Sequence, residues 1–299
     1  VPSHTRPLRG SKEINQLLTI YRDGIQYVHD QTIRMINLGM GPDEIAENLV
    51  LPKHLGDSPY LKEFYGTPAW SAKNVFSGYL GWFDGNPSNL KPLPKEKEAQ
   101  NIIDLVGGWD SLFKEAERAY YEEEYQWSLQ LTDYLLRIKA DDRQTELLRQ
   151  SNLIALGGKE SNPNSRYYYL SSARELEANY KPNDILLPDI EVVKRYPIES
   201  MLETLKVNVI PEKSIDKEIQ LLFTFSDSTK AFSLFLRRGV LEVQPFMIPG
   251  SSVQVNGREE DFKAVLSGIK SLPVSLVNGT LSVDGSRADL LSFFSSLRN

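Results

Sequence analysis

The sequence predicts a multidomain α+β protein in which an all-α domain is followed by a smaller α+β domain. Two patterns predict this order. In the first two-thirds of the 299 residues, apolar side chains recur at three- and four-residue spacing, as in amphipathic helices. After residue 198 they recur at every second residue, as in half-buried strands. We therefore expect domains over 11–180 and 198–299, joined by a proline-punctuated linker over 181–197.

The longest expected helix begins at Ser11, a suitable N-cap, and ends at Gly39. Two shorter helices follow, through 43–49 and 69–80. Each is introduced by a proline, which is tolerated in the first helical turn because no N–H bond is lost there. The residues after the third helix, DGNP at 84–87, are a strong turn signal.

Between residues 95 and 157 the pattern resolves into about four helices, separated by glycine pairs and charged turns. The stretch 116–136 resembles a tetratricopeptide-type (TPR-like) helix pair. Because at least three such repeats usually stack in a free-standing solenoid, we expect a helical packing module inside a larger domain. A last helix of this domain is expected over 166–178.

The second domain is expected to contain a meander of strands followed by alternating helices and strands. Gly239, in the turn Arg238–Gly239, can adopt the positive φ that a tight hairpin demands. The expected order is three strands, a helix, a strand and a helix, over 219–225, 231–235, 240–244, 257–266, 279–283 and 287–297.

Composition excludes several classes of function. The net charge is −6, and the Lys and Arg residues are scattered, so nucleic acid is not an expected partner. No apolar run approaches the ~20 residues of a membrane helix, so no integral membrane segment is expected. The chain has no cysteine, which excludes disulfides and thiolate metal sites. A cysteine-free chain is compatible with a cytoplasmic, secreted or periplasmic location, and the sequence does not choose between them.

Two segments carry a family resemblance, YRDGIQYVHDQT at 21–32 and GYLGWFDGNP at 78–87. They resemble the zinc-dependent alkyl sulfatases of the metallo-β-lactamase superfamily. The element order of the second domain, with LEV at 241–243 and GTLSVDG at 279–285, is similar to the sterol-carrier-protein-like domain that ends those enzymes. The resemblance implies that 1–10 is the tail of a catalytic domain and that 11–180 is the dimerisation domain.

The resemblance also implies a function for the complete enzyme. A zinc-activated water would hydrolyse an alkyl sulfate ester of the dodecyl sulfate type to an alcohol and sulfate. Two zinc ions would be bound mostly by an N-terminal catalytic domain, through a His-x-His-x-Asp-His motif that this chain lacks. Whether this chain alone is an enzyme is therefore open, and none of its residues is assigned a catalytic role. It would supply homodimer contacts, an active-site lid and substrate contacts.

His4 and Arg22 are the first candidate site residues. His4 stands in the loop where the resemblance places the last zinc ligand, and neutral imidazole is a common ligand. The alternative is an unordered terminal histidine. Arg22 lies on the long helix, where the resemblance places an arginine near the sulfate, and a guanidinium can bind two sulfate oxygens at once. The alternative is a structural ion pair with Asp23.

Tyr79 and Trp82 are the other candidates, because they lie where a helix breaks into a glycine-rich turn. The resemblance implies that Tyr79 donates its hydroxyl to the sulfate and that Trp82 flanks the alkyl chain. Aromatic packing within the turn is the alternative. His29 is expected to be a hydrogen-bonded structural histidine. Because successive helical residues project about 100° apart, we expect it not to pair with Asp30.

Two further alternatives are open. The chain could be a non-enzymatic dimerisation module fused to a binder of lipids or other amphiphiles, although apolar strand faces in the second domain are more commonly core. The two halves of the enzyme could also occur as separate polypeptides, divided just before Val1. Turnover of dodecyl sulfate only in the presence of the upstream half would favour the enzyme. Alkyl-chain binding by residues 198–299 would favour the module.

Overall fold

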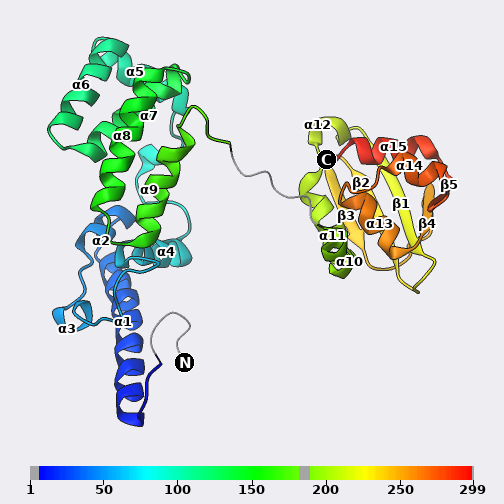
Figure 1. Cartoon of the computed structure of the whole chain (residues 1–299), viewed down its shortest axis with the longest axis horizontal. Helices are drawn as coiled ribbons and strands as arrows, with labels where there is room; N and C mark the ends of the chain where they lie inside the picture. Colours follow the sequence, from blue (N-terminus) through cyan, green and yellow to red (C-terminus); the bar gives the residue numbers. More distant parts are fainter. Residues whose placement is uncertain (1–6, 182–188, 298–299) are drawn as a thin grey trace. The chain divides into compact units, whose positions relative to one another are not determined.

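The computed structural model describes residues 7–181 and 189–297. The chain divides into two compact units, Val1–Pro182 and Asn183–Asn299. The first unit is helical, and the second combines helices with one sheet (Figure 1). The predicted fold class, an all-α domain followed by an α+β domain, is therefore confirmed. Within the described ranges, no helix is long and apolar enough to cross a membrane.

The helical unit contains the four helices that the sequence predicts between residues 95 and 157, as α5 to α8. The helices of this unit are α1 (Ser11–Asn37), α2 (Pro42–Asn48), α3 (Lys53–Gly56), α4 (Pro68–Leu80), the 3-10 turn η1 (Pro87–Asn89), α5 (Lys95–Leu105), α6 (Trp109–Tyr121), α7 (Tyr125–Ile138), α8 (Arg143–Lys159) and α9 (Pro163–Glu175).

Glycines end two of these helices where the sequence predicts. Gly39 has φ +84°, and the next N–H, that of Met40, donates to the Met35 carbonyl at 3.2 Å. Gly107 has φ +92°, and the Gly108 N–H donates to the Ile103 carbonyl at 2.8 Å. In both cases a left-handed glycine lets the chain reverse and satisfy a carbonyl of the last helical turn.

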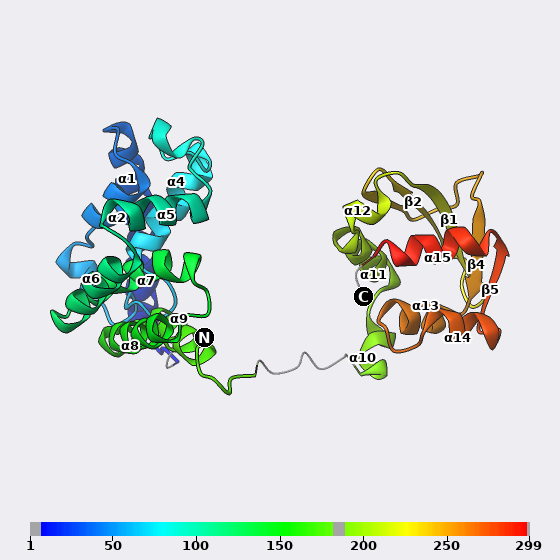
Figure 2. The same ribbon diagram turned by 90° about the horizontal axis from the view of Figure 1, so that it is seen from above.

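Helices α6 to α9 each pack against the next along the chain (Figure 2). The wholly buried Ala116 lets α7 approach α6 closely. There the Ser128 hydroxyl donates to the Ala116 carbonyl at 2.8 Å, and the Asn152 amide of α8 donates to the Ser128 oxygen at 2.7 Å. One buried polar chain thus links three helices, and the helix pair α6–α7 contains the predicted TPR-like stretch 116–136.

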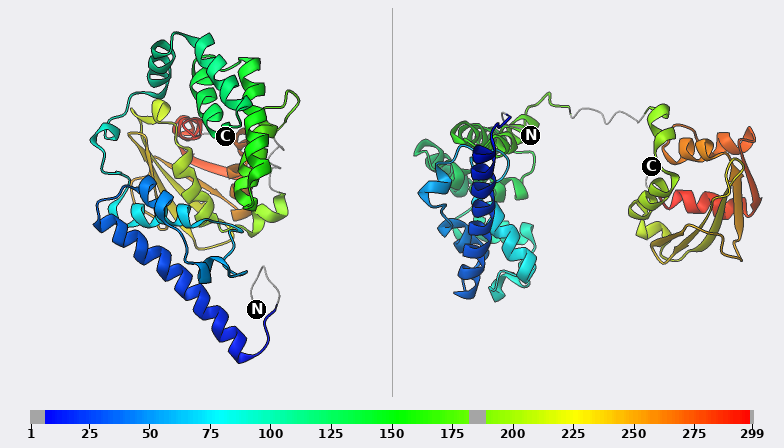
Figure 3. Two further views of the ribbon diagram at one scale, coloured as in Figure 1. Left: turned by 90° about the vertical axis from the view of Figure 1, so that its left-hand side faces the viewer. Right: turned by 90° about the horizontal axis from the view of Figure 1, so that it is seen from below.

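The N-terminal half of α1 extends beyond the other helices of its unit (Figure 3). Ile14, Leu18, Tyr21 and Ile25 are between 39% and 69% exposed there. Their spacing of four, three and four residues places them on one face of the helix. We call these four side chains the α1 stripe. An exposed apolar row of this kind marks an interaction surface.

The second unit is built on a five-stranded sheet with the order β3-β2-β1-β4-β5. The elements of this unit are α10 (Ile190–Arg195), α11 (Ile198–Leu205), the 3-10 turn η2 (Lys206–Asn208), α12 (Pro211–Ser214), β1 (Glu218–Phe225), β2 (Ala231–Arg237), β3 (Val240–Gln244), β4 (Val253–Gly257), α13 (Glu259–Leu266), α14 (Leu272–Val277), β5 (Leu281–Gly285) and α15 (Arg287–Ser295).

Helices cover one face of this sheet (Figure 2). The alternate residues Leu221 and Phe223 of β1 point to that face and are buried against Leu202 of α11 and Phe293 of α15. The hairpin between β2 and β3 turns at Arg238 and Gly239, with φ of 49° and 81°. Two positive φ values match the twist of the flanking strands. The predicted turn is therefore confirmed.

Several elements differ from the sequence-based expectation. The expected helix over 257–266 is present as α13, which begins at Glu259, but the sequence does not predict the strand before it, β4, which pairs in parallel with β1. The segment expected as a linker, 181–197, holds helix α10. Val193 of α10 is only 4% exposed, and the Lys263 ammonium of α13 donates to the Lys194 carbonyl at 3.0 Å. These contacts make α10 part of the second unit.

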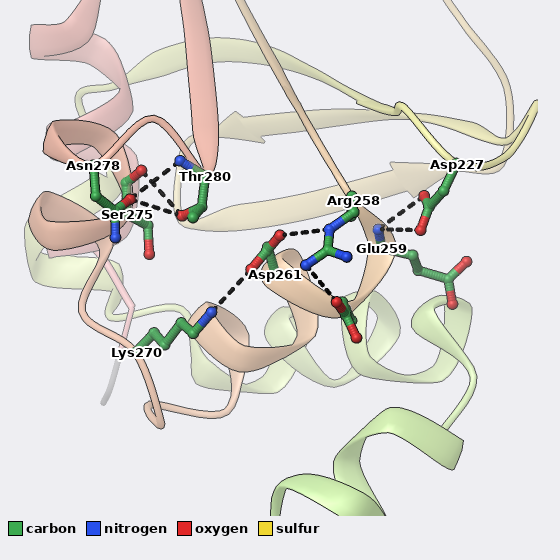
Figure 4. Close-up of polar contacts among 9 residues, drawn as sticks. Asp227, Arg258, Glu259, Asp261, Lys270, Ser275, Asn278 and Thr280 are labelled. Atoms are coloured by element: carbon green, nitrogen blue, oxygen red, sulfur yellow. Dashed lines mark hydrogen bonds and ion pairs between the residues drawn. The ribbon is translucent and has the colours of Figure 1, made fainter.

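Polar side chains tie the first turn of α13 to a neighbouring loop and to the segment that follows the helix (Figure 4). The Asp227 carboxylate accepts the Glu259 N–H at 3.0 Å and so caps α13 from a neighbouring loop. Asp261 is only 3% exposed, and its carboxylate accepts from Lys270 at 2.9 Å and from Arg258 at 3.3 Å. A buried carboxylate needs such partners, because removing a charge from water is costly.

Candidate functional site

Packing between α1 and α4 positions the candidate site. Ala72 and Phe76 of α4 are buried against Met35 of α1 and the neighbouring Ile45 of α2. Because residues three apart lie on the same side of a helix, Tyr79 follows Phe76 toward α1. The Tyr79 hydroxyl lies 2.9 Å from Nε2 of His29.

His29 uses both of its ring nitrogens, which corrects one expectation from the sequence. Its Nδ1 lies 2.9 Å from the Asp30 carboxylate, so His29 and Asp30 do form a pair. The 100° between neighbouring residues separates their Cβ directions, but Nδ1 lies close to the backbone and a short Asp side chain reaches it. Gln26 donates to the other Asp30 oxygen at 3.2 Å. These hydrogen bonds, from His29 first and Gln26 second, hold the pKa of the Asp30 carboxyl below its ordinary value.

Arg22 lies on the same face of α1 as His29. The two residues are seven positions apart, which is about two turns or ~10 Å along the helix axis. The Arg22 guanidinium lies 2.7 Å from the Asp23 carboxylate, with 68% of its side chain exposed. An exposed pair of this kind contributes only about 0 to 1 kcal/mol, so it leaves the guanidinium available to a better anion.

The described structure does not bring the other two candidates, Trp82 and His4, to His29. Gly81, at φ +80°, ends α4 and turns the chain outward, and the Trp82 that follows is 76% exposed. Its ring packs edge-on against Phe83, with centroids 5.7 Å apart, and lines neither of the cavities near His29. Tyr79 is likewise 63% exposed. His4 lies outside the described residues.

An apolar cavity of about 420 Å³ opens beside His29. Its size falls within the ~300–1,000 Å³ of small-molecule sites. Its polar lining residues are His29, Lys62, Glu63, Thr67 and Ser71, and the others are mostly apolar residues of α1, α4 and the segments between α2 and α4, among them Ile25, Val28, Leu51, Leu61 and Val75. A second cavity of about 520 Å³ shares Leu51 and Leu61 with it.

The loop that lines the cavity is held at two places. On α1, a Cβ at Gly24 would lie 2.8 Å from the Leu61 side chain, so only glycine lets Leu61 pack this closely. At the start of α9, the side-chain amides of Asn162 and Asn164 donate to the Gly66 and Tyr65 carbonyls at 3.3 and 2.9 Å. The loop path is therefore fixed by contacts to two helices.

Residues 7–181 and 189–297 contain no cluster of three His, Asp or Glu side chains that could hold a metal ion. A catalytic zinc needs about three protein ligands. The described part of the chain therefore does not fit a zinc site of its own.

Two family models match the chain. Residues 41–179 match the model described as alkyl sulfatase dimerisation, and residues 188–299 match the one described as alkyl sulfatase C-terminal. The chain belongs to the alkyl sulfatase family. The first of these matches covers the helical unit from α2 to α9, and the second covers the unit with the sheet.

Curated alkyl sulfatases align with almost the whole chain. It is 35% identical to a linear primary-alkylsulfatase of Pseudomonas, over 98% of this chain and 57% of that protein. It is 27% identical to an alkyl/aryl-sulfatase of Saccharomyces cerevisiae, over 98% of this chain and 46% of that protein. The chain thus spans about half the length of the curated relatives it matches.

A solved alkylsulfatase structure shares the fold of almost the whole chain. The stereoselective inverting sec-alkylsulfatase Pisa1 from Pseudomonas superposes with a TM-score of 0.91 and 25% identity, over 99% of this chain and 47% of that one. A sterol carrier protein from Aedes aegypti also aligns with part of this chain. The alignment covers 36% of this chain and 97% of that one, with a TM-score of 0.27.

Sequence reasoning identified only part of this candidate site. It singled out Tyr79 and Arg22, but it placed His29 among structural residues and did not find the cavity. The cavity residues Leu51 and Leu61 stand in short loop segments without periodicity. The HDQT run at 29–32 was the one signal that pointed to the His29 contact.

Proposed function

We propose that this chain is the C-terminal portion of a zinc-dependent alkyl sulfatase that hydrolyses alkyl sulfate esters, of the dodecyl sulfate type, to an alcohol and sulfate. One observation carries the proposal. His29, which is hydrogen-bonded to Tyr79 and lies on the same face of α1 as Arg22, lines a largely apolar cavity of about 420 Å³. Polar groups beside an apolar cavity suit a substrate with an anionic head and an alkyl tail.

Each site residue has a binding role in this proposal. The Arg22 guanidinium binds two sulfate oxygens in place of Asp23, and Tyr79 donates its hydroxyl to a third. The alkyl chain enters the cavity between Val28, Leu61 and Val75. Each buried methylene adds about 0.8 kcal/mol, so a long chain supplies most of the affinity. Trp82, three residues after Tyr79 in the chain, flanks the alkyl chain outside the cavity in this proposal.

Zinc belongs to the other half of the proposed enzyme, because the described residues of this chain do not form a metal site. His4 is the one residue of this chain that we propose as a zinc ligand. The remaining ligands would come from an N-terminal catalytic domain, in agreement with relatives of about twice this length.

Self-association is also part of the proposal. The match of residues 41–179 to a dimerisation model supports a homodimer. We propose that the α1 stripe takes part in the contact, because it is the longest exposed apolar row on α1 and lies next to that region.

The test is to produce the chain together with its upstream half and to measure bound zinc and dodecyl sulfate turnover. We expect stoichiometric zinc and turnover only when both halves are present. His4→Ala should lose zinc, whereas His54→Ala, the matched control on α3, should retain it. Unchanged zinc in His4→Ala would remove His4 from the site, and no turnover with both halves would refute the enzyme.

A second candidate, an amphiphile-binding module, is favoured by a separate cavity in the second unit. This cavity has a volume of about 360 Å³. Its lining is mostly apolar and comes from α10, α11 and α13, including Val192, Tyr196, Met201, Leu205 and Leu266. Because α10 contributes to the lining, the binding test needs residues 189–299. Saturable binding of dodecyl sulfate by that fragment, without turnover by the joined halves, would favour the module.

A further inference from the structure

A continuous series of hydrogen bonds connects α1 to α4. Gln26 donates to Asp30 at 3.2 Å, Asp30 lies 2.9 Å from Nδ1 of His29, and Nε2 of His29 lies 2.9 Å from the Tyr79 hydroxyl. The His29 and Tyr79 rings meet at a tilt, with centroids 5.7 Å apart. Both nitrogens of the imidazole are therefore engaged, and its protonation decides the direction of the last hydrogen bond.

At the Asp30 end of this series of hydrogen bonds, the positions of the hydrogens are fixed. Hydrogen bonds from His29 and Gln26 keep the pKa of the Asp30 carboxyl below its ordinary value, so the group is ionised at neutral pH. An ionised carboxylate only accepts hydrogen bonds, so Nδ1 of His29 must carry a hydrogen. In the neutral imidazole the other nitrogen, Nε2, is then an acceptor, and the Tyr79 hydroxyl must donate to it.

This arrangement leaves Tyr79 unable to donate elsewhere. A hydroxyl has one hydrogen, and when that hydrogen points at His29 the oxygen presents only lone pairs to an approaching anion. Uptake of one proton from solvent at Nε2 reverses the bond. The imidazolium then donates to the Tyr79 oxygen, and the Tyr79 hydrogen is free to point at the anion.

We propose that His29 is a positioning residue which allows Tyr79 to donate to a bound sulfate group when Nε2 is protonated, so that anion binding is accompanied by the uptake of one proton. That the bound anion is a sulfate group rests on the proposed function. Asp30 stabilises the imidazolium, because it is an anion in direct contact with Nδ1.

Few other charged groups of the described residues adjoin His29. Lys62 and Glu63 line the same cavity from the loop before α4, and the Lys62 ammonium is bonded to the Gly56 carbonyl at 2.8 Å. Arg22 lies two turns away on α1. Histidine is the side chain whose charge ordinarily changes near neutral pH. Burial first, and Glu160 second, raise the pKa of the Glu63 carboxyl, so a pH dependence that is lost in His29→Gln assigns the proton to His29 and not to Glu63.

The experiment uses the chain labelled with ¹⁵N-histidine, whose three histidines give few signals. Long-range ¹H–¹⁵N spectra report which ring nitrogen carries the hydrogen, and His29→Gln assigns the signal. We expect the Nδ1–H tautomer in neutral His29 and a loss of that preference in Asp30→Asn. The Nε2–H tautomer in the wild type would overturn the proposal without any ligand being added.

The second measurement titrates butyl sulfate, a short ester that does not form micelles readily, at pH values on both sides of the His29 transition. A hydrogen bond to a charged group contributes about tenfold in affinity, so binding should tighten by about that factor as His29 takes up its proton. The transition should also move to higher pH when butyl sulfate is bound. His29→Gln, whose amide can donate at every pH, should bind with an affinity that does not change with pH.

Two results separate this inference from the proposed function. If Tyr79→Phe weakens binding but the wild-type affinity does not change across the His29 transition, Tyr79 binds the anion and the role of His29 is refuted. If Tyr79→Phe binds as tightly as the wild type at low pH, or the chain binds no butyl sulfate at any pH, the Tyr79 site of the proposed function fails and the inference fails with it.

Discussion

At the scale of single residues, Arg22 has two competing partners. Its guanidinium contacts Asp23 at 2.7 Å, but both side chains are largely exposed to water. Solvent and salt screen such a pair. A sulfate group offers the planar guanidinium two oxygens in the matching geometry, and we therefore expect the anion to displace the carboxylate.

Replacing Arg22 by Lys tests this competition. Lysine keeps the charge but cannot form the two-point contact, so we expect the KM of the joined halves for dodecyl sulfate to rise about tenfold. Steady-state kinetics measure the change. Arg34→Lys is the matched control on the same helix, because Arg34 contacts the Gln31 side chain instead. Identical kinetics for the two variants would assign Arg22 to the structural pair.

Asp84 gives a pH-dependent prediction. In the turn after α4, its carboxylate accepts hydrogen bonds from the Asn86 N–H at 2.9 Å and from the Asn89 amide, and these hold the pKa of the Asp84 carboxyl below its ordinary value. A lowered carboxyl pKa stabilises the fold above the unfolded-state value of about 4, and this contribution is lost as the pH falls through the folded-state value. Stability should therefore fall in acid.

The variant Asp84→Asn should remove that contribution. Its free energy of unfolding should lie below that of the wild type at pH 7, and the difference should close in strong acid. Urea unfolding at pH 7 and pH 3 measures both values. Asp141→Asn, in the exposed turn between α7 and α8, is the control. A difference that is the same at both pH values would show that the Asp84 charge does not stabilise the turn.

Two residues, Gly239 and His29, show what can and what cannot be predicted from the sequence. The positive φ of Gly239 follows from its place in a two-residue hairpin turn, and the structure agrees. The pairing of His29 with both Asp30 and Tyr79 does not follow from spacing, because it depends on a side-chain rotation and on a residue 50 positions away. Contacts between distant residues are set by packing, which a single sequence does not reveal.

At the scale of elements, the α1 stripe is the feature with the clearest consequence. Four apolar side chains on one exposed helix face require a covering surface, and a second copy of the chain supplies the same row by symmetry. An ionised side chain placed in such a contact would be buried without a partner, which is strongly unfavourable.

The substitution Leu18→Glu should therefore weaken the proposed homodimer. We expect its dissociation constant to rise about a hundredfold or more, since one unpaired charge at an interface costs several kcal/mol. Analytical ultracentrifugation over a concentration series measures it. Asn15→Glu adds the same charge to the same exposed helix outside the stripe and should leave the constant unchanged. Equal effects of the two variants would point to charge repulsion rather than to the stripe.

Long elements follow from the sequence, and short ones do not. Helices α5 to α8 carry several turns of apolar periodicity, and their ends coincide with glycines or charged turns. Strand β4 spans five residues, of which only Val253 and Val255 show alternation before a glycine. Helix α10 spans six residues between prolines at 188 and 197. Such short segments take their structure from the core they join.

At the scale of the whole molecule, each unit has its own core. The core of the second unit is built from its own sheet and helices, with Phe223, Leu234 and Phe293 almost completely buried. A self-contained core of this size is the usual condition for independent folding. The boundary matters, because α10 adds the buried Val193 to this unit.

Two fragments test the boundary. Residues 189–299 should unfold in one cooperative transition. Residues 198–299, which lack α10, should be less stable by about 2 kcal/mol, the value of burying one aliphatic side chain. Thermal and urea unfolding followed by circular dichroism give the comparison. Equal stability of the two fragments would return the segment 189–197 to the linker predicted from the sequence.

The two asparagines at the start of α9 hold the cavity loop by its main chain. Both amides donate to backbone carbonyls, of Tyr65 and Gly66, and backbone carbonyls are present whatever the side chains are. These hydrogen bonds therefore do not depend on which side chains most of the loop residues carry. Side chains that line the cavity beside His29, such as those of Lys62 and Glu63, can be exchanged during evolution while the loop keeps its course. The family can thus change the shape of this cavity by point mutation without rebuilding the helices around it.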